Sequence, residues 1–207
     1  MQEYHKIQGL FKRDKTTNKF IMGEYSMPEL EYLKDNEWIF TEKVDGTNIR
    51  VDWNPEEGLM YGGKTDKAQM PPTLLVRLRE MFSDVLFFEL YPDTPMTLYG
   101  EGYGVKIQAA GKNYKPDGVD FVLFDIKIGR WYLKREDIFK IANTLNLELV
   151  PVVGCGTLED GIKLVTSGLK SCWGDFEAEG IVCKPKIDLS ARSGMRIVTK
   201  IKHKDFK

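Results

Sequence analysis

The sequence predicts a mixed α and β fold built mainly on antiparallel sheets. Short runs rich in β-branched and aromatic residues recur along the chain, and amphipathic helical patterns interrupt them. In addition, polar and apolar residues alternate in the segment GTNIRVDW at residues 46–53. Because such alternation is typical of a strand with one face in water, it favours antiparallel over parallel sheets.

Strands are expected where the β-branched and aromatic runs occur. In chain order they cover residues 38–43, 47–53, 59–61, 96–101, 120–126, 149–153, 180–184 and 196–202. Strands therefore dominate the predicted fold.

Four helical patterns separate these strands. The first covers residues 28–33 with Ser26 as its expected cap, and the last covers residues 158–165 behind Thr157. Between them we expect a helix over residues 135–145 and a longer one over residues 73–90. The longer pattern places one apolar face toward the core, made of Leu74, Leu75, Leu78, Met81, Phe82 and Val85.

The composition is that of an ordinary globular domain. Of 207 residues, 42% are apolar and 29% charged, and neither a repeat nor a linker divides the chain. We therefore expect a single domain over residues 1–207, with no separate C-terminal nucleic-acid-binding domain.

Several classes of protein are disfavoured by the same composition. No apolar run is long enough for a membrane span, and the polar start resembles no signal peptide, so we expect a cytoplasmic protein with no membrane partner. The three cysteines, Cys155, Cys172 and Cys183, are too scattered for a disulfide framework or a zinc site. A net charge of −1 argues against coating nucleic acid by bulk attraction.

The most informative segment is EKVDGTN at residues 42–48. It places Lys43 at the end of one predicted strand and Gly46 in a turn before the next. A lysine amine attacks phosphorus only when neutral, which costs on the order of 4 kcal/mol near neutral pH. Nearby positive charge and desolvation must supply that shift. A lone K-x-D-G tetrapeptide is more often a surface lysine beside a turn.

Further elements follow this tetrapeptide in a fixed order. They are Tyr99-Gly100-Glu101-Gly102, Phe121-Val122-Leu123-Phe124-Asp125, Glu179-Gly180-Ile181-Val182 and Lys200-Ile201-Lys202. In this order they resemble the covalent nucleotidyltransferases, the superfamily that includes DNA ligases, RNA ligases and mRNA capping enzymes. The resemblance implies two largely antiparallel sheets with flanking helices that form a nucleotide-binding cleft.

The resemblance also implies a reaction and its residues. Lys43 is expected to attack the α-phosphate of ATP and carry AMP, while Lys200 and Lys202, two apart on one strand face, stabilise the phosphate. Glu179 is expected to hold Mg²⁺ or Mn²⁺ that accompanies ATP. Nucleotide contacts are expected from Glu42, Asp45, Gly46, Asn48, Lys64, Glu101, Phe124 and Glu179, with Glu101 on the ribose and Phe124 on the base. Asp125 is interpreted as structural, capping a turn.

Within the superfamily, the strings EKVDGTN, YGGKTD and YGEGYGVKIQ look most like phage-type RNA ligases that seal nicks in duplex RNA. Lys64 stands where an arginine is common in that pattern. The expected substrate is nucleic acid with 5′-phosphate and 3′-hydroxyl ends, either RNA or a nicked duplex. A DNA ligase, with Arg50 as the arginine that follows its K-x-D-G element, a GTP-using capping-type guanylyltransferase and a catalytically silent nucleic-acid-binding module remain alternatives.

The C-terminal segment is rich in cations. From Lys184 onward only Asp188 and Asp205 oppose the basic residues. Cations outside the K-x-K element, such as Arg192 and Lys204, are expected to bind the nucleic-acid strand. Many ligases carry a further domain that binds the nucleic-acid strand. A separate strand-binding partner or a homo-oligomer is therefore a second expectation for this chain.

Overall fold

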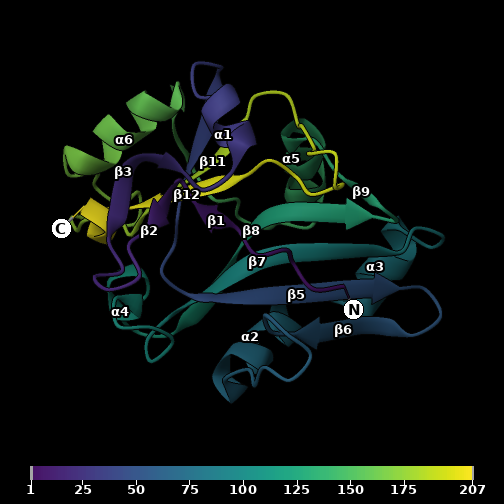
Figure 1. The fold of residues 1–207 in the computed structure, drawn as a ribbon. Coiled ribbons are helices and arrows are strands. Elements are labelled where there is room, and N and C mark those ends of the chain that lie inside the picture. The colour runs from purple at the N-terminus through teal and green to yellow at the C-terminus, as the bar shows by residue number, and fades with distance from the viewer. Residues whose placement is uncertain (1, 207) are drawn as a thin grey trace. The chain divides into compact units, whose positions relative to one another are not determined.

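The computed structural model describes residues 2–206, which form two compact units (Figure 1). Unit 1 contains residues 2–5 and 45–150, and unit 2 contains residues 6–44 and 151–206. The chain therefore passes from one unit to the other within the K-V-D-G element, between Val44 and Asp45. The expected single nucleotidyltransferase domain over residues 1–207 stays a prediction.

Unit 1 is built on a five-stranded sheet with the order β6-β5-β7-β8-β9. All neighbouring strands are antiparallel, which confirms the sheet type expected from the alternating segment. The strands are β5 (Thr47–Asn54), β6 (Gly58–Gly62), β7 (Met96–Gly104), β8 (Val119–Ile128) and β9 (Trp131–Tyr132). The last of these was not expected from the sequence.

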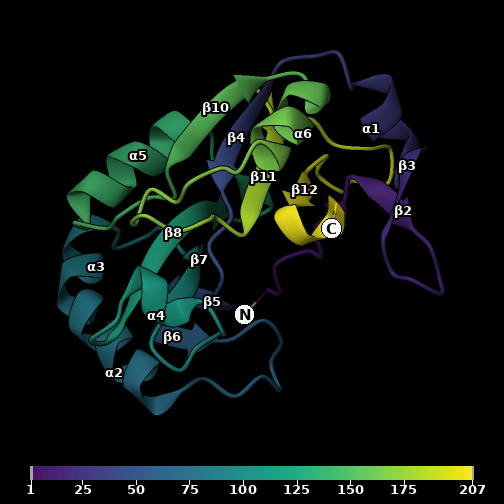
Figure 2. The same ribbon diagram turned by 90° about the vertical axis from the view of Figure 1, so that its left-hand side faces the viewer.

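Three helices pack on one face of this sheet: α2 (Pro72–Met81), α3 (Asp84–Leu90) and α5 (Arg135–Thr144). The short helix α4 (Gly111–Tyr114) lies against the end of β7. In Figure 2, α2, α3 and α5 lie along the same side of the sheet. Strand residues Ile49, Val51, Leu98 and Phe121 meet Leu74 and Leu78 of α2 in the core of unit 1. The opposite face of β5 and β7 is left for polar side chains.

The expected single helix over residues 73–90 is wrong. Phe82 has an extended conformation that ends α2, and the Ser83 side chain accepts a hydrogen bond from the Leu86 amide at 3.5 Å to begin α3. Val85 was expected on the buried face, but it is 68% exposed because the break rotates the second helix.

Unit 2 is built on a second five-stranded sheet with the order β1-β12-β11-β4-β10. Its strands are β1 (Gln8–Gly9), β4 (Trp38–Glu42), β10 (Val152–Gly156), β11 (Gly180–Pro185) and β12 (Thr199–Lys202). Only the β1 and β12 pair is parallel. The expected strands at residues 149–153 and 196–202 begin later in the structure, at Val152 and Thr199. Leu149 belongs to unit 1, where it makes a single bridge to Leu123.

The remaining elements of unit 2 are α1 (Pro28–Tyr32), α6 (Leu158–Thr166), the hairpin of β2 (Phe11–Arg13) and β3 (Phe20–Tyr25), and the 3₁₀ helix η1 (His203–Phe206). Thr157 caps α6 through a reciprocal pair of hydrogen bonds with Asp160, as expected. Ser26 does not cap α1, because Met27 occupies the cap position and the Ser26 hydroxyl donates to the Gly9 carbonyl instead. Strands β1, β2 and β3 were not expected.

Other expectations concern single residues. Within residues 2–206, no helix is both long and apolar enough to cross a bilayer. Cys183 is buried, and its burial raises the pKa of its thiol. Cys155 and Cys172 are exposed.

Candidate active site

Three neighbouring strand ends of unit 2 bring together Lys43, Glu179 and Lys202. Strand β11 lies between β4 and β12, with Ile181 opposite Glu42 and Gly180 opposite Lys202. Lys43 directly follows β4, Glu179 directly precedes β11, and Lys202 ends β12. The Lys43 amide also donates to the Gly180 carbonyl at 2.9 Å, which fixes the backbone at Lys43.

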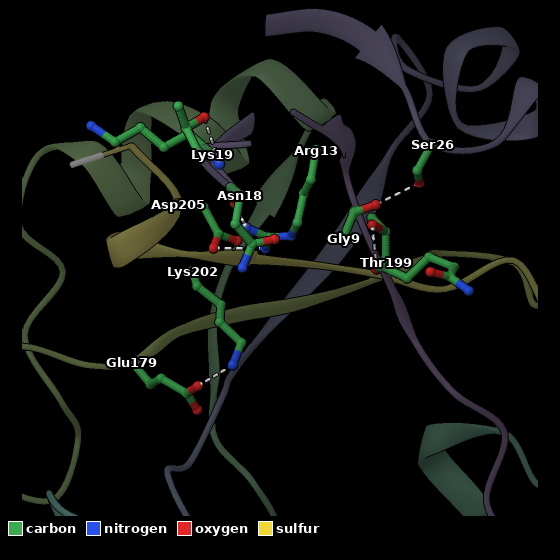
Figure 3. Close-up of polar contacts among 11 residues, drawn as sticks. Gly9, Arg13, Asn18, Lys19, Ser26, Glu179, Thr199, Lys202 and Asp205 are labelled. Atoms are coloured by element: carbon green, nitrogen blue, oxygen red, sulfur yellow. Dashed lines mark hydrogen bonds and ion pairs between the residues drawn. The ribbon is translucent and has the colours of Figure 1, made fainter. Parts of the chain in front are cut away.

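The Glu179 carboxylate bridges the two lysines. One oxygen accepts from Lys202 Nζ at 2.5 Å, and the other accepts from Lys43 Nζ (Figure 3 shows the Lys202 contact). The three side chains are only 15–20% exposed. Burial raises the pKa of Glu179, but the charges and hydrogen bonds of Lys43 and Lys202 overcome this effect and hold it below its ordinary value. We refer to these three residues as the lysine cluster.

A glycine is required at the first position of β11, directly after Glu179. Gly180 has a φ of +152°, and a Cβ there would lie 2.1 Å from the Ile201 carbonyl oxygen. Only glycine permits β11 to approach β12 this closely. The Glu-Gly order therefore lets the Glu179 side chain reach Lys202.

Lys200 shares a strand face with Lys202. In β12, Thr199 and Ile201 are buried while Lys200 and Lys202 are half-buried, as the alternation of a strand requires. This confirms that the two lysines project from the same side. Their action on a phosphate stays a prediction.

Glu42 faces a different environment from its neighbour Lys43. It is only 1% exposed, and its two carboxylate oxygens accept from the Ser171 hydroxyl at 2.6 Å and the Cys172 amide at 2.7 Å. The Glu42 side chain therefore holds the segment at residues 171–172 against β4. Its expected contact with the nucleotide stays a prediction.

In unit 1, Asn48 of β5 lies directly opposite Glu101 of β7. Directly opposed residues project from the same face of an antiparallel sheet. The Asn48 Oδ1 atom is buried and accepts no hydrogen bond from the described residues. A buried acceptor without a donor costs about 1–3 kcal/mol, which a ligand hydroxyl can recover.

The turn before β5 is fixed by close backbone contacts. A Cβ on Gly46 would lie 2.3 Å from the Gly102 carbonyl oxygen of β7. The Asp45 amide donates to the Tyr114 hydroxyl at 3.3 Å. Asp45 and Gly46 are therefore held in unit 1.

Phe124 lies in a bulge of β8. Tyr99 pairs with Asp125 and Gly100 pairs with Leu123, so Phe124 is the extra residue of the pairing. A bulge redirects a side chain, and here the Phe124 ring meets Tyr4 edge to face, 5.1 Å between centroids.

Asp125 lies within β8, so its expected place in a turn is wrong. It is fully buried and accepts a hydrogen bond from the Tyr4 hydroxyl at 2.5 Å. No local sequence pattern indicates Tyr4, because this contact joins residues 121 positions apart.

Lys64 is exposed in the loop that follows β6. Arg50 anchors this loop: it is fully buried and donates to the Gly63 carbonyl at 2.7 Å and to the Asp66 carboxylate at 2.9 Å. Arg50 is therefore a positioning residue for the loop. In the sequence, the feature that marks Arg50 is its position among the alternating polar residues of GTNIRVDW.

The structure thus joins Lys43, Glu179 and Lys202 within unit 2 and pairs Asn48 with Glu101 within unit 1. Residues 43–46 connect the two sets along the chain. Two mainly antiparallel sheets that carry the ordered K-x-D-G, E-G and K-x-K elements are the features of a nucleotidyltransferase fold.

Comparison with known proteins supports the same class. The sequence model of the RNA ligase family matches residues 36–202, so the chain belongs to the RNA ligase family. A comparison with curated protein sequences gave no match.

The fold is similar to solved structures of Naegleria gruberi RNA ligase. A variant without ligand and a variant with ATP and Mn each give a TM-score of 0.68 at 20% identity, covering 98% of this chain and 60% of that one. The same enzyme with PPi gives a TM-score of 0.67 at 21% identity, with the same coverage. This chain therefore spans about 60% of the length of those proteins.

Proposed function

We propose that this chain is an ATP-dependent RNA ligase that works through a covalent lysyl-AMP on Lys43. The observation that carries the proposal is the Glu179 carboxylate, which binds Lys43 and Lys202 together at adjacent strand ends. A nucleophilic amine beside a second cation and a carboxylate meets the requirements of phosphoryl transfer.

The first step is adenylation. Lys43 loses a proton, its Nζ forms a bond to the α-phosphorus of ATP, and the bond to the leaving pyrophosphate breaks. Charge on the phosphoryl oxygens increases in the transition state, and Lys200 and Lys202 are positioned on one strand face to stabilise it.

Two further steps join the nucleic acid. An oxygen of a 5′-phosphate attacks the lysyl-bound AMP phosphorus, which regenerates the Lys43 amine and gives an AMP-capped 5′ end. A 3′-hydroxyl then attacks the 5′-phosphate, a phosphodiester forms, and AMP leaves. We propose nicked duplex RNA as the substrate.

The residues present fit a divalent cation that arrives with the nucleotide. Among residues 2–206, no group of three or more His, Cys, Asp or Glu side chains forms a resident metal site. Mg²⁺ and Mn²⁺ bound to ATP need only one or two protein carboxylates, and Glu179 provides one. When bound, such an ion supplies positive charge that favours the neutral Lys43 amine and the developing phosphoryl charge.

The residues of unit 1 would bind the nucleoside. The unpartnered Asn48 Oδ1 atom and the opposed Glu101 carboxylate are suited to accept hydrogen bonds from ribose hydroxyls. Phe124, redirected by its bulge, offers an aromatic face for the base. Lys64 offers an exposed positive charge for phosphate on the loop that Arg50 anchors. The exposed free thiols of Cys155 and Cys172 suit a reducing cytoplasm.

Mass spectrometry after incubation with ATP or GTP and Mg²⁺ tests the proposal. We expect an AMP adduct that Lys43→Ala abolishes and Lys6→Ala, a matched change on an exposed lysine of unit 2, preserves. A GMP adduct would favour a capping-type enzyme, and no adduct would favour a silent binding module. Sealing of nicked duplexes that differ only in RNA or DNA beside the nick separates RNA from DNA ligase.

A further inference from the structure

We propose that the tip of the β2–β3 hairpin, residues 14–19, binds the sugar-phosphate backbone of the nucleic-acid substrate. We refer to this segment as the hairpin tip. The inference rests on the proposed function, in which a 5′-phosphate reacts at the lysine cluster, and it identifies a surface that grips the strand beyond the reacting end.

The base of the hairpin is fixed to the segment that follows Lys202. Arg13 donates to the Asp205 carboxylate of η1 at 2.7 Å and to the Asn18 carbonyl at 2.9 Å. Its guanidinium also lies 4.6 Å from the centre of the Phe20 ring, and Phe20 packs edge to face on Phe206. Figure 3 shows Arg13 directed at Asp205 beside Asn18. The hairpin is therefore docked at a defined place.

The hairpin tip is also closed by its own hydrogen bonds. One Asp14 carboxylate oxygen accepts from the Thr16 amide at 2.9 Å and the Thr17 amide at 2.7 Å. The hydrogen bonds from Thr17 and Thr16 lower the pKa of Asp14. The Asp14 amide donates to the Lys19 carbonyl at 2.9 Å. The turn is therefore held in one shape before any ligand binds.

The charges of the hairpin tip are available to a partner. Lys15 and Lys19 are exposed, as is Lys204 beside Asp205, and none of the three forms an ion pair with another described residue. Lys12, in contrast, pairs with Glu24. The other local carboxylates, Asp205 and Glu24, pair with Arg13 and Lys12, so these three ammonium groups remain available to a partner.

The chemistry of the hairpin tip suits a phosphate backbone better than a membrane surface. Besides its two lysines it presents Thr16, Thr17 and Asn18, all exposed polar residues whose hydroxyl and amide groups can donate to phosphate oxygens. It presents no exposed apolar side chain, which a membrane-bound segment would need.

The distance from the hairpin tip to the lysine cluster determines which phosphates of the strand the tip can reach. Lys202 and Asp205 are separated by about 6 Å of 3₁₀ helix, and Arg13 and Lys15 by at most about 7 Å of chain. With the lengths of the joined Arg13 and Asp205 side chains added, the tip cations lie within about 25 Å of Lys202. Phosphates recur about every 3.4 Å along one strand, so the tip would meet phosphates up to about seven nucleotides from the reacting end.

The test measures binding of a nicked RNA duplex by fluorescence anisotropy without ATP, at roughly 50 and 200 mM salt. Reversing both charges, with Lys15→Glu and Lys19→Glu, should weaken binding at least about tenfold at the lower salt and reduce the magnitude of the salt slope by about 2. Lys15→Arg with Lys19→Arg should retain wild-type binding. Lys34→Glu, a reversal on an exposed lysine elsewhere in unit 2, should change neither quantity by a comparable amount.

Two outcomes overturn the inference: double-reversed protein that binds as the wild type does, or wild-type protein that forms the AMP adduct and binds no duplex. Thermal melting of the double variant confirms its fold. A wild-type protein that forms no adduct contradicts the proposed function instead, and the anisotropy measurement is independent of that result because it needs no ATP.

Discussion

The Glu179 carboxylate accepts a hydrogen bond from Lys202 Nζ at 2.5 Å, across the pairing of β11 with β12. Its second oxygen accepts from Lys43, so one carboxylate holds both lysines in place. The lysine cluster consequently has two cations and one anion, and an incoming phosphate would supply the missing negative charge.

Glu179→Gln should slow adenylation of Lys43 by roughly a hundredfold or more, the usual scale for one electrostatic contact to a transition state. The amide keeps the size of the side chain but loses the charge that organises both lysines. The rate of AMP-adduct formation without nucleic acid measures this effect. The control is Glu37→Gln, which breaks a 2.8 Å ion pair with Lys186 on the surface of unit 2 and should leave the rate unchanged. Equal losses in both variants would contradict the assignment.

The same carboxylate predicts how stability depends on pH. Because the folded state holds the pKa of Glu179 below its ordinary value, its contribution is fully present above that ordinary value. The contribution is lost as pH falls through the lowered pKa. Urea unfolding at a series of pH values below about 5 should therefore show a smaller loss of stability in Glu179→Gln than in the wild type. Parallel curves for the two proteins would argue against this coupling.

Lys202→Ala and Lys200→Ala should each slow adenylation by about a hundredfold, with a loss that does not depend on salt. Arg192→Ala and Lys204→Ala should leave adenylation intact and weaken strand binding, through phosphate contacts that release counterions. Adenylation without nucleic acid, compared with sealing at two salt concentrations, separates the two effects. If the K-x-K variants adenylate normally, this segment is a docking surface only.

Arg50→Met should lower the free energy of unfolding by about 2 kcal/mol or more, because the Gly63 carbonyl loses its buried donor. Limited proteolysis at residues 63–70 should become faster as the loop carrying Lys64 loosens. Arg79→Met, on the exposed side of α2, is the matched control and should change stability by less than about 0.5 kcal/mol. Similar melting of the two variants would mean that Arg50 does not anchor the loop.

The parts of the fold that were predicted are those with strong local patterns. Strand β5 alternates clearly, and helix α6 begins with a complete capping box, so their neighbours in sequence determine them. Strand β1 has two residues and exists only because Gln8 and Gly9 pair with Thr199 and Lys200. No local pattern predicts a strand whose hydrogen bonds are all this distant.

The site was predictable to a similar degree. Motif order identified Lys43, Glu179 and Lys202 as candidates, and the structure brings these three together. Glu42 accepts from the Ser171 hydroxyl, 129 positions away, and no local sequence pattern indicates that partner. Arg50 and Tyr4 act through contacts with distant segments, which sequence alone does not specify.

The division of the chain has a consequence for its synthesis. Almost all of unit 1 is the continuous stretch at residues 45–150, so its sheet can assemble once that stretch has left the ribosome. In unit 2, β4 must wait for β11, and β1 must wait for β12. At about 5–20 residues per second, the fifty or so residues from Val150 to Lys202 take roughly 3–10 seconds to make. During that interval Trp38 and Phe40 can pair with β10 but not yet with β11, and Lys43 has neither Glu179 nor Lys202 beside it.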